Sequence, residues 1–127
     1  MELNKEYLIA ALNVPAGKVF TDYIMGKDEA EAHLNFKKRY SHMDYKILCT
    51  LPQEPAKVNG REMHNVKILY KLNDEEETFE YSCEQYMSAA TAIRKAIDKL
   101  INNYAGNSQL VEKSIIRIDV QHVGAEL

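Results

Sequence analysis

The chain has little of several residue types, and each shortage excludes a class of protein. Its 127 residues include two cysteines, three prolines, five glycines and no tryptophan. A small secreted domain usually depends on several disulfides, so we expect Cys49 and Cys83 to be reduced thiols in a cytoplasmic protein. The five glycines are not clustered. The sequence therefore lacks the glycine-rich loops that bind phosphate groups.

Long hydrophobic segments and an excess of one charge are also absent. The longest apolar run covers residues 7–12, which is far too short to cross a membrane. The first residues show no charged segment followed by an apolar one, so we expect no signal peptide. The formal net charge is −3. Domains whose main partner is nucleic acid are usually basic, so the charge argues against that class.

The residues that are present form the same order of elements twice. Residues 5–51 read as strand, strand, helix and strand, and residues 64–123 repeat that order. Apolar residues make up 46% of the chain and charged residues 28%, as in an ordinary globular domain. The sequence therefore predicts an α+β fold. It would consist of two ββαβ units, with a mainly antiparallel sheet on which two helices pack.

The segment 52–60 is the expected linker between these units. It contains two prolines and an Asn-Gly pair, which are typical of turns and connections. We predict one compact domain over residues 1–127, which consists of two ββαβ units at residues 1–52 and 61–127. The two units show no convincing residue-by-residue match. Duplication followed by divergence, and two independent occurrences of a common unit, both remain open.

The first unit contains a clear helix start. Asp28 followed by Glu31 predicts an N-cap with its reciprocal acidic partner, and the helix is expected to run from Glu29 to about Ser41. The closing strand covers residues 45–51. Because side chains alternate along a strand, one side of this strand is predicted to carry Tyr45, Ile47, Cys49 and Leu51.

The second unit begins with a strong hairpin signal. Apolar and polar residues alternate through 66–72 and again through 78–83, which predicts two antiparallel strands. The acidic run 74–77 lies between them. A calcium loop would need ligands at several spaced positions and a glycine for its sharp turn, and this run has no such glycine. We interpret it as a solvated hairpin tip that also discourages edge pairing.

The rest of the second unit is a helix and a strand. Ser82 and Gln85 are the expected caps of an amphipathic helix whose apolar residues recur every three or four positions up to Tyr104. Gly106 is expected to end this helix. The final strand covers 114–123, and its inward side chains are predicted to be Ile116, Ile118 and Val120.

The first strand, residues 7–12, is apolar on both sides and therefore requires cover on both faces. The cover can come from the other half of the chain or from a second copy of it. Exposed on a monomer, such a strand would reduce solubility. We predict a homodimer, with an interface formed by Leu8, Ala10, Leu12, Phe20 and Ile24.

No catalytic or metal-binding motif is recognisable. No histidine or cysteine pair has the spacing of zinc ligands, so we expect no metal and no cofactor. The sequence has no nucleophile motif. Cys83 lies where a strand meets a helix, but its alternation points it inward, and Cys49 lies in a similar apolar series. We therefore expect buried structural cysteines and no enzyme. The four histidines are scattered: His33, His42, His64 and His122.

The best candidate binding segment is residues 36–40, in which three cations lie between two aromatic residues. Such a segment can hold a phosphate backbone and stack a base. A structural explanation also fits, because cations near a helix C-terminus complement the helix dipole and the two aromatic residues are spaced to face a core. The candidate ligand contacts are Lys37, Lys38, Arg39 and Tyr40.

These observations favour a small non-enzymatic binding protein that acts as a homo-oligomer, with another protein as partner. The alternative is a module that binds single-stranded nucleic acid or a small anionic ligand such as a nucleotide. An enzyme whose site is assembled between subunits is the third interpretation. Compact chains of this style often occur as accessory proteins of phages or mobile elements, which we keep as a hypothesis of origin.

Overall fold

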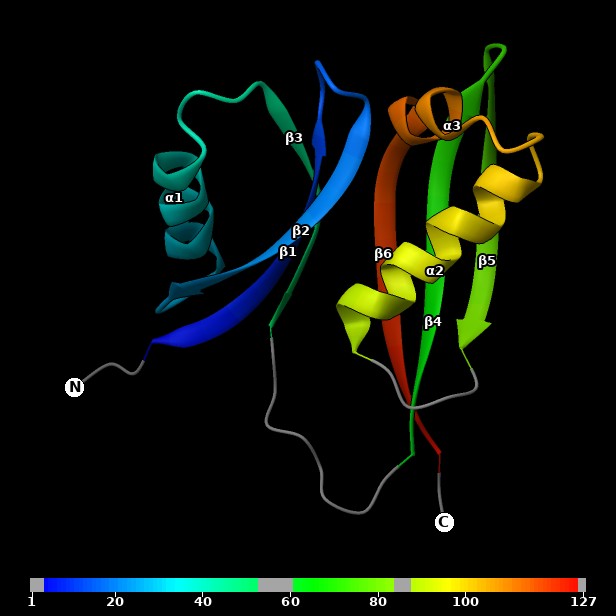
Figure 1. Ribbon diagram of the computed structural model, residues 1–127. Coiled ribbons are helices and arrows are strands. Elements are labelled where there is room, and N and C mark those ends of the chain that lie inside the picture. Colours follow the sequence, from blue (N-terminus) through cyan, green and yellow to red (C-terminus); the bar gives the residue numbers. More distant parts are fainter. Residues whose placement is uncertain (1–3, 53–60, 84–87, 126–127) are drawn as a thin grey trace.

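A computed structural model describes residues 4–52, 61–83 and 88–125 (Figure 1). Within these ranges the chain forms six strands and three helices. The first half contains β1 (Lys5–Asn13), β2 (Lys18–Gly26), α1 (Glu29–Arg39) and β3 (Tyr45–Pro52). The second half contains β4 (Arg61–Leu72), β5 (Glu75–Cys83), α2 (Ala89–Asn102), α3 (Ser108–Ser114) and β6 (Ile115–Ala125).

The strands form two antiparallel sheets with the same topology. Their orders are β2-β1-β3 and β5-β4-β6, so the first strand of each half lies at the centre of its sheet. The predicted α+β class and its two ββαβ units are confirmed. The second half differs by one element, because α3 is a short helix between α2 and β6 that the sequence pattern did not predict.

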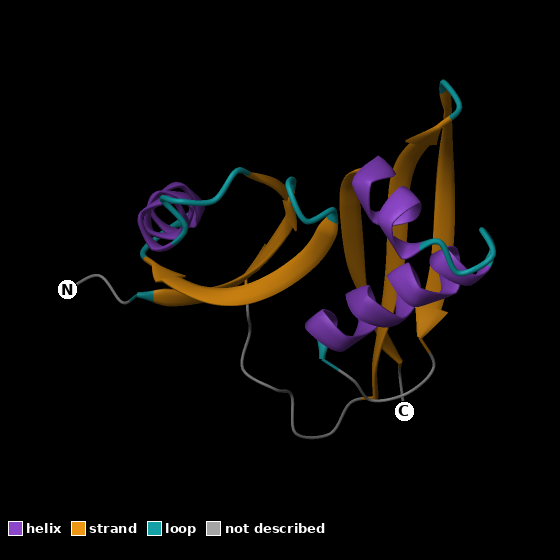
Figure 2. Ribbon diagram, turned by 45° about the horizontal axis from the view of Figure 1, so that its top comes forward, coloured by secondary structure: helices purple, strands orange, loops and turns teal. Residues whose placement is uncertain are grey.

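The two halves share one core. The edge strands β3 and β6 lie side by side and run in the same direction (Figure 1). α1 covers one face of the first sheet. α2 and α3 pack on one face of the second sheet and also contact the first (Figure 2). Leu8, Ala10 and Leu12 of β1 belong to the same buried cluster as Ile68 of β4 and Ile97 of α2.

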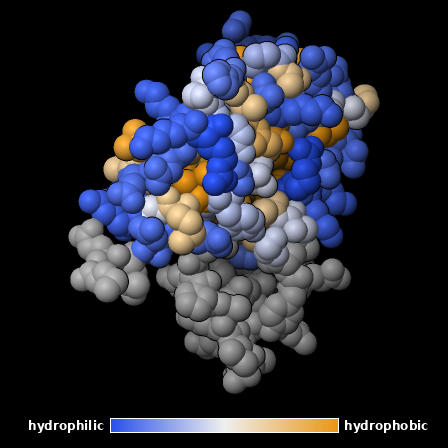
Figure 3. Space-filling model, turned by 60° about the vertical axis from the view of Figure 1, so that its left-hand side comes forward, coloured by the Kyte–Doolittle hydropathy of each residue, from blue (hydrophilic) through white to orange (hydrophobic). Residues whose placement is uncertain are grey.

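The second face of β1 is therefore covered from within the chain. Leu8, Ala10 and Leu12 are at most 5% exposed in the single chain. The face of the molecule seen in Figure 3 is mainly hydrophilic, with hydrophobic side chains in small separate patches. The solubility argument for a homodimer at this strand thus no longer applies, and the oligomeric state stays a prediction.

The prediction that the five interface residues share one face is wrong. Residues directly opposite in an antiparallel pair lie on the same side of the sheet, and Ile24 is opposite Tyr7 while Phe20 is opposite Ala11. Those pairs pack under α1, in a second cluster that contains Phe36. Leu8, Ala10 and Leu12 point to the other side, so the five residues divide between the two faces.

A β-bulge in β3 overturns the predicted alternation of that strand. Ala10 pairs with Cys49 and Ala11 pairs with Ile47, so Leu48 is the extra residue. Before the bulge, Tyr45 and Ile47 pack under α1. After it, Cys49 and Leu51 pack in the shared core. The four residues predicted on one side therefore lie on both.

The second half has the corresponding bulge in β6. Leu69 pairs with Arg117 and Tyr70 with Ile115, so Ile116 is the extra residue. Ile115, only 2% exposed, is consequently the core residue in place of the predicted Ile116. Each register shift lies at the same place on its central strand. In β1 it follows Ala10, three residues before the strand ends at Asn13, and in β4 it follows Leu69, three residues before the strand ends at Leu72. The shared defect favours duplication over independent origin.

The start of α1 agrees with the sequence prediction. The Asp28 carboxylate accepts a hydrogen bond from the Glu31 N–H at 2.8 Å, and the Glu31 carboxylate accepts one from the Lys27 N–H at 3.2 Å. These bonds satisfy backbone donors that the first helical turn leaves open. The helix ends at Arg39, two residues earlier than predicted, and Leu34 on its surface is 52% exposed.

The ends of the second-half elements differ more from prediction. Ser88, not Ser82, caps α2 by accepting a hydrogen bond from the Thr91 N–H, since Ser82 is still part of β5. Gln85, the other predicted cap, lies outside the described residues. α2 ends at Asn102, and Gly106 closes the following turn with a φ of 76°.

The tip of the second hairpin is a two-residue turn. Asn73 and Asp74 have φ values of 53° and 64°, the left-handed geometry of a type I′ turn. The remaining acids, Glu75–Glu77, belong to β5, where their side chains are exposed. The predicted solvated tip is thus shorter than the acidic run.

At Gly26 the end of β2 packs against the backbone at the start of α1, and we expect Gly26→Ala to destabilise the protein. A Cβ there would lie 2.6 Å from the Ala32 nitrogen and 3.1 Å from the Asp28 carbonyl oxygen, both backbone atoms that cannot rotate away. Overpacking of this kind costs about 1–3 kcal/mol. Urea unfolding of the variant measures the effect, and an unchanged midpoint would contradict the proposed close packing.

Candidate functional site

A groove follows the seam between β3 and β6. Its volume is about 510 Å³, within the usual size of small-molecule sites. Both halves of the chain contribute to it. Its lining comes from a stretch of each edge strand and one residue of β4: Leu48, Cys49, Thr50, Leu51, Lys67, Arg117, Ile118, Asp119, Val120 and Gln121.

The strands on either side of the groove leave backbone groups available. β3 and β6 are edge strands of separate sheets. Over their described residues, no backbone hydrogen bond joins one strand to the other. Strand edges carry rows of N–H and C=O groups that pair readily with an added partner. The groove therefore offers hydrogen-bonding groups from its walls as well as from its side chains.

Three charged side chains lie along the second-half wall of the groove. Arg117 donates from Nε to the Asp119 carboxylate at 3.0 Å, and both side chains are more than half exposed. Lys67 of β4 is directly opposite Asp119 in the sheet register. Lys67 is half-buried and makes no ion pair with any described residue. The wall thus has two cations and one acid.

On the first-half wall of the groove, the hydroxyl of Thr50 and the thiol of Cys49 are both poorly reactive. Thr50 Oγ1 is 2.6 Å from His33 Nε2, so this hydroxyl is already hydrogen-bonded to α1. Burial, followed by the nearby charges of Asp119 and Glu29, raises the pKa of Cys49 to about 12. At neutral pH its thiol is therefore protonated and a poor nucleophile.

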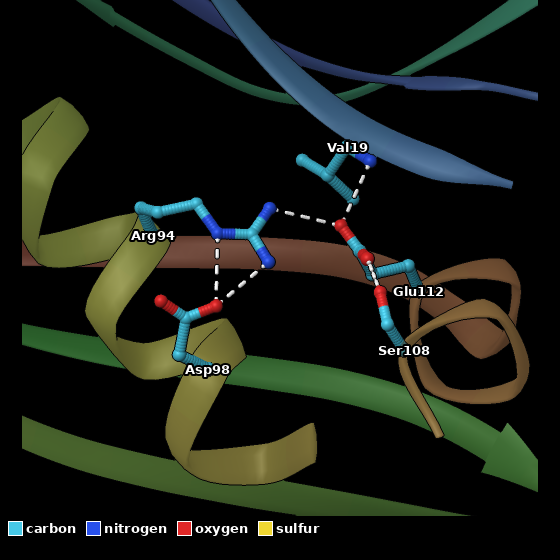
Figure 4. Close-up of polar contacts among 5 residues, drawn as sticks. All are labelled: Val19, Arg94, Asp98, Ser108 and Glu112. Atoms are coloured by element: carbon cyan, nitrogen blue, oxygen red, sulfur yellow. Dashed lines mark hydrogen bonds and ion pairs between the residues drawn. The ribbon is translucent and has the colours of Figure 1, made fainter. Parts of the chain in front are cut away.

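A second polar cluster joins the two halves on the other side of the shared core (Figure 4). Glu112 of α3 is only 1% exposed. One of its carboxylate oxygens accepts hydrogen bonds from the Val19 N–H of β2 at 3.1 Å and from Arg94 of α2 at 2.9 Å. The other oxygen accepts a bond from Ser108. The hydrogen bonds of this carboxylate link β2 to α2 and α3.

Arg94 completes this cluster by contacting a second acid. Its guanidinium donates to Asp98 at 2.8 and 3.1 Å as well as to Glu112. Partial burial lowers the pKa of Arg94, but the bonds to Asp98 and Glu112 outweigh it and raise the pKa above its usual value. Each side chain of the cluster is therefore hydrogen-bonded, and Glu112 is closed to solvent, as expected of a structural contact.

The predicted binding residues Lys37, Lys38, Arg39 and Tyr40 lie at the C-terminal end of α1, and none of them lines the groove. Arg39 is bonded to Asp22 at 2.9 Å, and the Tyr40 hydroxyl donates to the same carboxylate at 2.5 Å. Phe36, the other aromatic residue of the segment, is fully buried. Within residues 36–40, Lys37 and Lys38 are the exposed cations that make no ion pair with a described residue.

Asp22 is the acid that orients this segment. Partial burial raises the pKa of Asp22, but hydrogen bonds from Tyr40, Arg39 and the Tyr23 N–H hold the pKa below its usual value. Burial and then the bond to Asp22 raise the pKa of Tyr40 to about 12. The segment thus docks α1 onto β2, and its aromatic rings are packed rather than presented for stacking.

The histidines and cysteines do not converge. Among the described residues no group of three or more His, Cys, Asp or Glu side chains is placed to hold a metal ion. His33 is on α1, His42 is exposed after it, and His64 is buried in β4. The side chains of Cys83 and His122 lie outside the described part. No helix in the described ranges has the length and apolar character needed to cross a membrane.

Comparisons with known proteins identify no family for the chain. No family model matches the chain, and no curated protein is similar to it.

Neither the groove nor the Glu112 cluster was predicted from the sequence. Lys67, Arg117, Asp119 and Gln121 were recognised only as outward residues of their strands, and Glu112 was not singled out. No local signal was available for Glu112, because it lies in the mostly polar segment Ser108–Ser114 and is followed directly by Lys113. No local signal indicates that β3 and β6 meet, since their residues are some 70 positions apart in sequence.

Proposed function

We propose that the chain is a small non-enzymatic binding protein whose ligand lies in the groove between β3 and β6. The observation that carries the proposal is the seam itself, where two unpaired strand edges and a half-buried lysine line about 510 Å³ of space. Sites for small molecules commonly lie in such clefts between structural units, with a few polar groups fixing the ligand.

The chemistry of the lining supports binding rather than catalysis. A nucleophile needs an activated group with a nearby base, and the Cys49 thiol in the lining has a raised pKa. Thr50 is bonded to His33, which is not among the residues that line the groove. The remaining polar side chains are two cations, one acid and one amide, which suit recognition.

A fragment screen by two-dimensional NMR tests this function. We expect bound fragments to shift the amide resonances of residues 48–51 and 117–121 and to leave those of α1 unchanged. Gln121→Trp should abolish these shifts by filling the groove, because Gln121 is exposed and lines it. Thr78→Trp is the matched control, since Thr78 is exposed on the same sheet away from the groove. Shifts that persist in Gln121→Trp, or a screen without groove shifts, would overturn the proposal.

The predicted homo-oligomer is a separate question from the groove. Of the large apolar side chains that are exposed in the described structure, Tyr23 and Met25 share β2, whereas Val14, Leu34 and Leu110 lie on a turn, on α1 and on α3. An oligomer would therefore need an interface other than the one predicted on β1. The mass in solution by light scattering decides between one chain and two.

A further inference from the structure

We propose that the outer edge of β5 is a docking site for a basic, extended segment of another protein. The segment adds a strand to the three-stranded second sheet through backbone hydrogen bonds, as peptides do at open sheet edges. No residue of β5 lines the groove between β3 and β6, so this surface is separate from the proposed ligand site.

The other strand edges of the described structure are occupied. β3 and β6 lie beside each other. Side chains from two helices bond to the outer edge of β2. A backbone N–H of this strand donates to Glu112 of α3, and two of its carbonyl oxygens accept from Arg39 and Asn35 of α1, at 3.3 and 2.9 Å. These side chains take up groups that an added strand would need.

The outer edge of β5 is open over its described residues. The type I′ turn makes Leu72 and Glu75 a hydrogen-bonded pair, so alternate residues after Glu75 direct their N–H and C=O away from β4. These outward residues are Glu76, Thr78, Glu80 and Ser82. No hydrogen bond in the described structure reaches their outward backbone groups. β5 has β4 as its one neighbour in the sheet, so this edge is available for pairing (Figure 1).

The charge beside this edge favours a basic partner. Residues 74–77 and Glu80 are all acidic. Lys67 and Lys71 of β4 are the two cations opposite this stretch in the register, so three acids are in excess. None of the five acids forms an ion pair in the described structure. Opposite charges on neighbouring strands stabilise a sheet, so a strand that carries lysine or arginine balances the excess.

The same charges argue against a second copy of the chain as the occupant. Pairing β5 with its own copy doubles the excess of acids at the junction, and like charges across a strand pair are destabilising. Charged side chains are a common protection of exposed sheet edges. The edge is thus protected from its own copy and open to a strand of opposite charge.

The side chains of β5 also give the pattern expected of the partner. An added strand needs cations opposite Glu76, Glu77 and Glu80. It needs apolar residues opposite Phe79 and Tyr81, which are half-buried against the shared core. An antiparallel partner with this pattern reads Val-Lys-Val-Thr-Lys-Lys.

The test uses this hexapeptide with acetylated and amidated ends, and a control peptide with glutamate in place of each lysine. We expect the basic peptide to slow hydrogen exchange of the outward Thr78 and Glu80 amides and to leave the groove amides of 48–51 and 117–121 unchanged. The Phe79 amide, which points toward β4, is the internal reference. The acidic peptide should bind about tenfold more weakly or less.

Three protein variants separate the strand edge from overall charge. Glu76→Gln combined with Glu80→Gln should weaken the basic peptide about tenfold. Glu6→Gln combined with Asp44→Asn is the matched control, since both are exposed acids in the first half and the change in net charge is the same. Binding to this control should be unchanged. Thr78→Pro keeps every charge but removes one outward N–H, so it should also weaken the peptide.

The outcomes separate this surface from the groove. Equal protection by the acidic peptide, or equal weakening by the two double variants, would overturn the basic partner. Protection of the groove amides alone, or of no amide, would overturn the docking edge and leave the function proposed for the groove as it is. Protection of Thr78 and Glu80 without peptide, together with a doubled mass by light scattering, would assign the edge to a second copy and overturn the proposal.

Discussion

Replacing Arg94 with methionine is expected to lower the free energy of unfolding by about 2–3 kcal/mol. The variant keeps most of the side-chain volume but leaves the Glu112 carboxylate, 1% exposed, without its cation. The Val19 N–H and Ser108 hydroxyl would then be the remaining donors to that charge. The expected loss is smaller than the about 3–5 kcal/mol of a fully buried pair because Arg94 is 44% exposed, so water can partly replace it.

Two further variants show whether the loss comes from the unpaired charge. Lys95→Met is the control on the same helix, since Lys95 is exposed and makes no ion pair in the described structure. Its effect should stay within about 0.5 kcal/mol. Adding Glu112→Gln to Arg94→Met should recover part of the loss, because the uncompensated charge is removed. Equal urea midpoints for Arg94→Met and Lys95→Met would contradict the role given to this pair.

Truncating Phe36 to alanine is expected to cost about 3–5 kcal/mol, the usual effect of removing a buried phenylalanine ring. Phe36 is fully buried and contacts three other rings, with centroids 6.0 Å away in Phe20, 4.6 Å in Tyr40 and 5.0 Å in Tyr45. Of the helix side chains, only Ala32 is buried with it. Phe36 is thus the main apolar anchor of α1.

Hydrogen exchange would show where this loss is felt. The cluster under α1 is separate from the core that the two halves share. We expect Phe36→Ala to expose the amides of α1 first, while α2 keeps its protection. Leu34→Ala is the control on the same helix, because Leu34 is 52% exposed and its removal should change little. Uniform loss of protection across both halves would instead indicate a single cooperative core.

Local patterns predicted the elements, and long-range contacts decided the site. Alternation and capping residues were sufficient for the hairpins and for the start of α1, because both depend on neighbouring residues. The inward set of each third strand was misassigned because one bulged residue, Leu48 or Ile116, reverses the alternation. Periodicity cannot reveal such an insertion within a run of consecutive apolar residues, as at 47–49 and at 115–116.

The groove illustrates the same limit more strongly. Lys67, Arg117 and Asp119 are ordinary outward residues of an antiparallel sheet until β3 is placed beside them. That placement follows from burial of Leu8, Ala10 and Leu12 against the second half. The sequence did predict that this strand face needs cover, and left open whether the same chain supplies it.

The direction of β3 and β6 has a consequence for how the chain arose. The equivalent edge strands lie side by side and run the same way (Figure 1). The halves are not symmetric copies, because α2 and α3 also contact the first sheet, whereas α1 packs on β2 of its own half. Two separate ββαβ chains can nevertheless associate through such edge strands. Joining them into one chain turns a concentration-dependent association into an intramolecular one. It also frees the two halves to differ, so that only one wall of the groove carries Lys67, Arg117 and Asp119.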